Sequence, residues 1–135
     1  MIYLIVNIMF ILSNNTDYYS IDQALINEQK IYFGLPTKFY NPAIIDFELA
    51  IKSTPEYEKL SKTDFGTAKY WIILSRATDI VIVNIRKKAI ESGFDLVVEK
   101  KYWNSLNINI SSIDITNSVI ETINNKEKNN NYKHK

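Results

Sequence analysis

The residues that could do chemistry in this chain are few, and most of them are carboxylates. Asp46 and Glu48 stand two positions apart at the end of a short apolar run, and Glu56 and Glu58 follow in a segment with helical character. Two carboxylates with separated pKa values can serve as general acid and general base. Because acidic side chains are mostly exposed, we interpret these four as solvated charges at helix ends. We therefore predict that the protein is not an enzyme.

Other catalytic and metal-binding groups are scarce. The chain has no cysteine, which excludes thiolate chemistry, disulfides and Cys-based metal sites. Its single histidine, His134, lies in the polar stretch NNNYKHK, where we expect a solvated side chain. The sequence contains no GxSxG motif and no phosphate-binding glycine loop. We accordingly expect no catalytic residue, no cofactor and no metal site.

The composition is that of an ordinary globular chain with a modest core. The chain has 135 residues, 46% of them hydrophobic and 23% charged, and a formal net charge of +1. Such a charge offers no strong field for nucleic acid. Trp71, Trp103 and nine tyrosines could stack on bases, but no basic stripe accompanies them. We expect these aromatics in a core or an interface, and no nucleic-acid partner.

The two ends of the chain differ from its middle. Residues 1–12, MIYLIVNIMFIL, are apolar but shorter than the roughly 20 residues that span a bilayer. We interpret residues 1–13 as a signal-like or anchoring segment with possible membrane association, although no basic residue precedes the run; a buried strand or helix is the alternative. Residues 14–40 are predicted to be a linker or N-terminal extension. The Asn- and Lys-rich residues 125–135 are predicted to be a disordered tail.

The middle of the chain predicts a helical hairpin between strands. Residues 41–47 are typical of a short strand, and Pro55 marks the first turn of a helix capped by Ser53 or Thr54. A turn at residues 64–67 leads into a helix over residues 67–92, which Gly93 ends. Several apolar residues lie off its main apolar face, which suggests that another chain covers them. The candidate contacts with a partner are Tyr70, Trp71, Ile72, Ile82 and Val83.

The hairpin returns to further strands. Residues 94–98 predict a buried strand, residues 103–110 a second strand with alternating apolar positions, and Asp114 or Thr116 the cap of a last helix. The predicted class is α+β, with a small sheet body, a helical hairpin inserted between strands and a C-terminal helix, in the order β-α-α-β-β-α. The hairpin is expected to project from the body as a coiled-coil-like pair of helices.

Residues 41–124 resemble the OmpH/Skp-like periplasmic chaperone family. The resemblance rests on Ala43–Phe47 as the opening strand, on the Phe-Asp-Leu-Val-Val strand at 94–98 and on the closing Asp-Ile-Thr-x-x-Val-Ile segment at 114–120. It implies a homotrimer that binds unfolded outer-membrane polypeptides in the periplasm, with no cofactor, and it leaves open anchoring to the inner membrane. The residues that it places at the trimer core are Ile44, Ile45, Phe47, Phe94, Leu96 and Val98.

The predicted arms are short for that family. About 45 residues separate the two strands, so two equal helices would each be about 20 residues, or about 30 Å, long. Any cavity would be shallow. Two hypotheses follow: a chaperone-like binder of unfolded exported polypeptides, or a trimeric scaffold of the cell envelope that does not enclose clients.

Overall fold

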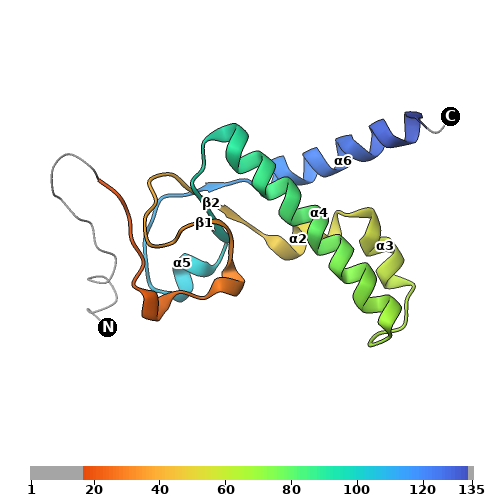
Figure 1. The fold of residues 1–135 in the computed structure, drawn as a ribbon, viewed down its shortest axis with the longest axis horizontal. Helices are drawn as coiled ribbons and strands as arrows, with labels where there is room; N and C mark the ends of the chain where they lie inside the picture. Colours follow the sequence, from red (N-terminus) through yellow and green to blue (C-terminus); the bar gives the residue numbers. More distant parts are fainter. Residues whose placement is uncertain (1–16, 134–135) are drawn as a thin grey trace.

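A computed structural model describes residues 17–133, and a mixed four-stranded sheet lies at its centre (Figure 1). The strands lie in the order β1-β3-β2-β4, where β1 is Ile31–Gly34, β2 is Pro42–Ile45, β3 is Leu96–Glu99 and β4 is Ile113–Asp114. Strand β2 runs parallel to β3 and to β4, whereas β1 runs antiparallel to β3. The predicted segment 1–13 and His134 lie outside the described residues.

Three helices form the hairpin between β2 and β3. They are α2 (Phe47–Lys52), α3 (Pro55–Ser61) and α4 (Ala68–Ser92). Helix α4 has 25 residues, which corresponds to about 37 Å, while α2 and α3 together form the shorter arm. The predicted arms of equal length are therefore wrong. The bend at Ser53 and Thr54 breaks the shorter arm, because Thr54 caps α3 through the Tyr57 N–H.

The caps of α4 follow from two residues of the sequence. The side chain of Thr67 accepts a hydrogen bond from the Tyr70 N–H, which satisfies one of the free amides at the helix start. Gly93 has φ 75° and ψ 24°, the left-handed conformation that ends helices at little cost for glycine. The predicted bounds of this helix are confirmed. The α+β class, with a helical hairpin inserted between strands, is confirmed as well.

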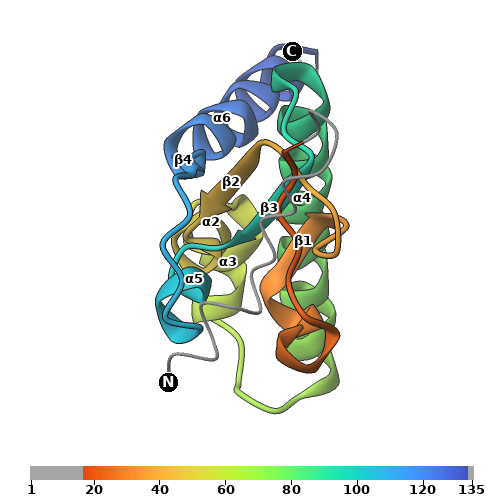
Figure 2. The same cartoon turned by 90° about the vertical axis from the view of Figure 1, so that its left-hand side faces the viewer.

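Both faces of the sheet are covered by the same chain. One face packs on α2, α4 and α6 (Thr116–Lys133), with Ala43, Ile45 and Val97 against Val81, Ile85 and Val119. Segment 17–30 and α5 (Tyr102–Ser105) lie on the opposite side of the sheet (Figure 2). There Leu96 and Val98 pack on Ile21, Phe39 and Trp103. A single subunit therefore shelters its own sheet.

The segment predicted to be a linker is part of the body. Tyr19 and Phe39 form a β-bridge, and the Tyr102 hydroxyl donates to the Leu25 carbonyl oxygen at 2.9 Å. Strand β1 then pairs with β3, and Ile21 is 1% exposed. Of the two alternatives predicted for this segment, the linker is wrong for residues 17–40, because Ile21 and Phe39 fill the second face of the sheet, and the N-terminal extension remains.

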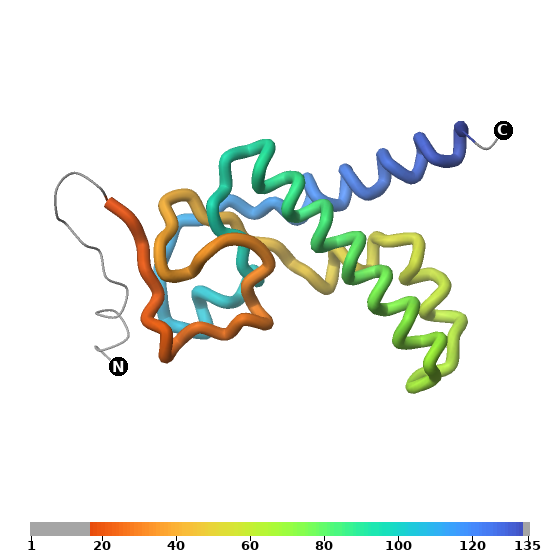
Figure 3. Tube along the Cα trace, in the orientation of Figure 1, coloured from red at the N-terminus to blue at the C-terminus, as the bar shows by residue number. Residues whose placement is uncertain are grey.

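Two further predictions fail near the C-terminal end. Residues 103–110 are not a strand: Tyr102–Ser105 are helical, Asn107 has φ 54°, and the strand pairing with β2 comes only at Ile113–Asp114. Ile108 and Ile110 are buried as the alternation predicts, but by side-chain packing. Helix α6 continues to Lys133, so the disordered tail is wrong for residues 125–133. Only its first turns are anchored in the core, and the helix then projects away from the body (Figure 3).

Candidate functional site

An open cleft of about 730 Å³ lies where the hairpin leaves the sheet. Its volume is within the range of about 300–1,000 Å³ that is usual for ligand sites. The carboxyl ends of β2 and β3 form the body wall of the cleft together with β1, α2 and α5, and helices α3 and α4 form the hairpin wall. The apolar and aromatic residues that line it are Tyr32, Phe47, Ile51, Tyr57, Leu60, Tyr70, Leu74 and Tyr102.

Aromatic rings are fixed on both walls of the cleft. On the body wall, Tyr32 and Phe47 stack with ring centroids 4.4 Å apart. On the hairpin wall, Tyr70 projects from the first turn of α4, one turn before Leu74. Aromatic side chains offer a large apolar contact area that loses little conformational entropy on binding. The cleft is therefore suited to apolar side chains of a ligand.

The cleft continues into exposed aromatic residues at the hairpin tip. Phe65 is 79% exposed and Trp71 is 51% exposed. Phe65, Tyr70 and Trp71 contact one another edge-on, with centroid distances of 5.1, 5.8 and 5.2 Å. Because Tyr70 also lines the cleft, the tip and the cleft form one surface. We call this surface the aromatic track, and it consists of Phe65 and Trp71 together with the apolar cleft residues named above.

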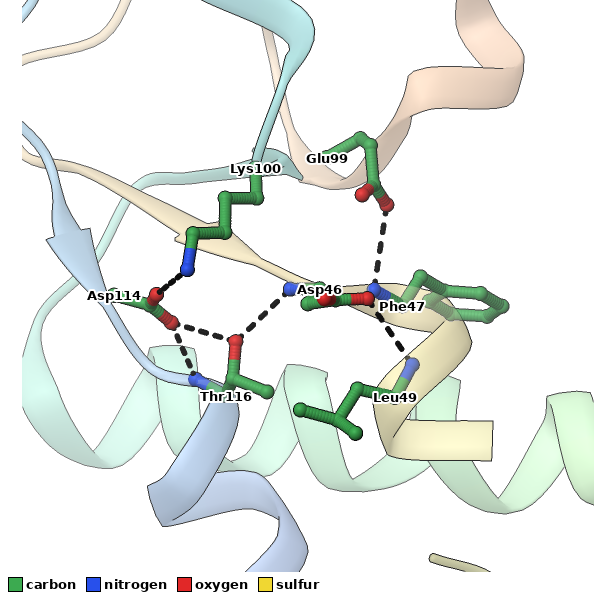
Figure 4. Close-up of polar contacts among 7 residues, drawn as sticks. All are labelled: Asp46, Phe47, Leu49, Glu99, Lys100, Asp114 and Thr116. Carbon is green, nitrogen blue, oxygen red and sulfur yellow. Dashed lines mark hydrogen bonds and ion pairs between the residues drawn. The ribbon is translucent and has the colours of Figure 1, made fainter. Parts of the chain in front are cut away.

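Polar groups at the end of β2 form a structural network (Figure 4). The Thr116 hydroxyl donates to Asp114 at 2.6 Å and accepts from the Asp46 N–H at 2.9 Å, which ties β2 to the start of α6. Asp114 also pairs with Lys100 at 3.0 Å. Partial burial of Asp114 would raise the pKa of its carboxyl, but the hydrogen bonds from Thr116 and Lys100 outweigh it and hold that pKa below its usual range.

Two of the carboxylates considered for catalysis, Asp46 and Glu48, and the neighbouring Glu99 are engaged in local structure. Asp46 caps α2 by accepting from the Leu49 N–H at 3.1 Å, and Glu48 pairs with Lys52 at 2.7 Å. Glu99 accepts from the Tyr32 hydroxyl at 2.7 Å; burial, and then this contact, raise the pKa of Tyr32 far above its usual value. Residues 17–133 hold no cluster of three or more His, Asp or Glu side chains that could bind a metal.

The predicted partner contacts fall into two groups. Tyr70, Trp71 and Ile72 lie together at the tip, where Ile72 is 52% exposed. Ile82 and Val83 lie about 15 Å further along α4, and of these only Val83 is largely exposed. Phe65 was not predicted as a contact residue, although an aromatic residue in a polar turn beside Gly66 is a signal of exposure. Tyr32, Tyr57 and Tyr102 were not predicted either.

The predicted trimer-core residues are placed inside one subunit. Ile45, Leu96 and Val98 are fully buried and Phe94 is 8% exposed. Ile44 and Phe47 are half-buried, with Phe47 stacked on Tyr32. A second copy is therefore not needed to cover these strands, and a homotrimer remains a prediction.

In residues 17–133 there is no helix whose length and apolar character would allow it to cross a bilayer. Comparisons with protein-family models, with curated proteins and with solved structures each gave no match to this chain.

Proposed function

We propose that this protein binds unfolded segments of outer-membrane or other exported polypeptides in the periplasm, as a chaperone-like binder without bond-making chemistry. The observation that carries the proposal is the aromatic track. Its open cleft is lined by four tyrosines and Phe47, and it extends to Phe65 and Trp71 at the tip. Contiguous exposed apolar surface of this kind is typical of a binding site.

The size of the track fits weak and reversible binding. Covering about 200 Å² of apolar surface at the tip would contribute about 5 kcal/mol before the costs of association. Burial of one or two ligand side chains in the cleft adds to this. An unfolded chain exposes such side chains, whereas a folded protein hides most of them. The track would therefore distinguish unfolded from folded polypeptides without reading a particular sequence.

A scaffold role is the second candidate, and one feature of α4 favours it. Ile72, Val83 and Ile90 are each more than half exposed and share the helix face opposite to the buried Val81. Such a stripe could pair copies of the chain into the trimer that the sequence predicts. Of the three stripe residues, only Ile72 lies beside the aromatic track. Variants at Val83 and Ile90 can therefore separate a scaffold role from polypeptide binding.

Suppression of aggregation tests the proposed function. A denatured outer-membrane protein is diluted from urea into buffer with a molar excess of this protein, and light scattering is followed. We expect strong suppression by the wild type, weak suppression by the Phe65→Ser/Trp71→Ser variant, and wild-type suppression by the matched control Val83→Ser/Ile90→Ser. Equal scattering with and without the wild type would count against the proposal. An oligomer that only the control variant disrupts, without any suppression, would select the scaffold.

A further inference from the structure

Two lysines of the cleft have no carboxylate partner in the described chain. Lys30 and Lys101 line the body wall of the cleft, and neither forms an ion pair with any residue of 17–133. The other two lysines of the cleft are paired, Lys52 with Glu48 at 2.7 Å and Lys100 with Asp114 at 3.0 Å. Lys30 and Lys101 are thus the cations that remain available to a ligand.

The carboxylates that face the cleft already have donors from the protein. Glu99 accepts from the Tyr32 hydroxyl at 2.7 Å and from the Phe47 N–H at 3.3 Å. Asp46 accepts from the Leu49 N–H, and Glu48 holds Lys52. Because each carboxylate already accepts a hydrogen bond or forms an ion pair within the chain, it has less to gain from a cation or hydrogen-bond donor of a ligand. The cleft therefore offers positive charge to a ligand more readily than negative charge.

The two free lysines lie at the same end of β3. Lys30 immediately precedes Ile31, which pairs with Val98 in the antiparallel register of β1 and β3. Lys101 follows Val98 by three residues. Figure 1 shows β1 and α5 on the left of the view, in the body, and α3 on the right, in the hairpin. An apolar side chain held against Tyr57, Leu60 and Leu74 on the hairpin wall would thus have cations opposite to it.

We propose that the cleft selects unfolded segments in which an aromatic or aliphatic side chain stands next to Asp or Glu. The inference rests on the proposed function and specifies the class of segment that the track binds. The apolar group would enter the cleft, and the neighbouring carboxylate would reach Lys30 or Lys101. A polypeptide fits better than a single acyl chain, because the apolar surface runs out of the cleft to Phe65 and Trp71 and accommodates several side chains in sequence.

Three labelled peptides with one apolar core test the charge selectivity. Their flanking positions carry Asp, Asn or Lys, and fluorescence anisotropy gives the Kd of each for the full chain at low and high salt. We expect the Asp peptide to bind about three- to tenfold more tightly than the Asn peptide, and the Lys peptide most weakly. High salt should reduce the differences in Kd among the three peptides, since exposed charges are screened.

Two matched double variants locate the effect. Lys30→Gln/Lys101→Gln should lose the preference and bind the Asp peptide no more tightly than the Asn peptide. Lys126→Gln/Lys128→Gln removes the same charge from the exposed part of α6 and should keep the wild-type preference. A wild type that binds all three peptides equally, or that prefers the Lys peptide, overturns the inference and leaves the proposed function standing. Failure to bind any of them contradicts the proposed function itself, and binding of dodecanoate in its place would assign the cleft to a lipid carboxylate.

Discussion

The sheet body buries its apolar side chains, whereas the hairpin tip exposes two large aromatic side chains to solvent. In the body, Ile45, Leu96 and Val97 are completely buried, and helices cover one face of the sheet while segment 17–30 and α5 cover the other. At the tip, Phe65 and Trp71 are mostly exposed although they belong to the same subunit. Other large apolar side chains, such as Leu35 and Ile90, are exposed too, but Phe65 and Trp71 form one cluster with Tyr70, which lines the cleft. We therefore expect the stability of the fold to depend on the body, and we propose that binding depends on the tip.

This contrast changes how the resemblance to the chaperone family is understood. The trimer was expected because the resemblance implies one, with residues of the strands around the hairpin at its core. The described chain covers these strands itself, with α2, α4 and α6 on one face of the sheet and with Ile21 and Phe39 on the other. Association of subunits, where it occurs, would therefore use surfaces outside the sheet, such as the stripe of Ile72, Val83 and Ile90.

The largest expected effect is the loss of a body side chain. Ile45→Ala removes a fully buried side chain between β2 and the helices, and should lower the free energy of unfolding by about 2–5 kcal/mol. Ile90→Ala is the matched control, because Ile90 is 68% exposed and should change it by less than about 0.5 kcal/mol. Urea denaturation followed by circular dichroism measures both. If both variants lost a similar amount of unfolding free energy, the distinction between a buried body and an exposed helix surface would be contradicted.

A second test examines whether β1 is docked on β3 as part of the body. Gly34 has φ 88°, and an added Cβ would collide with the Asp95 carbonyl oxygen, so Gly34→Ala should cost near the upper end of about 1–3 kcal/mol. Gly93 has φ 75° with open space around it, so Gly93→Ala should cost only about 1 kcal/mol from the left-handed backbone. Thermal unfolding of the two variants gives the comparison. If Gly34→Ala were the milder change, β1 would not be docked on β3 as described.

The Asp114 network gives a smaller effect that depends on pH. The pKa of Asp114 is depressed in the folded state, so its carboxylate stabilises the fold above its ordinary pKa, and this contribution is lost as the pH falls through the folded value. The stability advantage of the wild type over Asp114→Asn should be full at pH 7 and should shrink below about pH 4. It should be smaller than the preceding effects, because half-exposed ion pairs are screened by solvent. An advantage that grows with acidification, measured by urea denaturation at several pH values, would contradict this sign.

Sequence reasoning succeeded where local chemistry decides the structure. Thr67 and Gly93 fix the ends of α4 through a cap and a left-handed residue, and the β-branched runs around Ala43 and Leu96 form the paired strands. It failed where long-range packing decides. Residues 103–110 alternate like a strand, yet Tyr102 and Trp103 are held in a helical turn by contacts with segment 17–40.

In the candidate site, too, the features set by local sequence could be predicted, whereas those set by long-range packing could not. Trp71 and Ile72 could be identified as surplus apolar residues from the helical period alone. The cleft could not, because Tyr32, Tyr57 and Tyr102 come from separate parts of the chain and meet only after the hairpin folds onto the body. The helical residues 125–133 were missed because their composition is polar throughout, whereas the helix is anchored upstream by Val119 and Ile123.

The most direct measurement of the central claim is a titration of an unfolded outer-membrane polypeptide, held in dilute urea, into the wild type and into Phe65→Ser/Trp71→Ser. Each protein is first shown to have the same urea midpoint, since the tip contributes little to the body. The account predicts that the wild type binds the polypeptide and that the variant, equally stable, binds it at least tenfold more weakly. Equal affinity of the two proteins would contradict it.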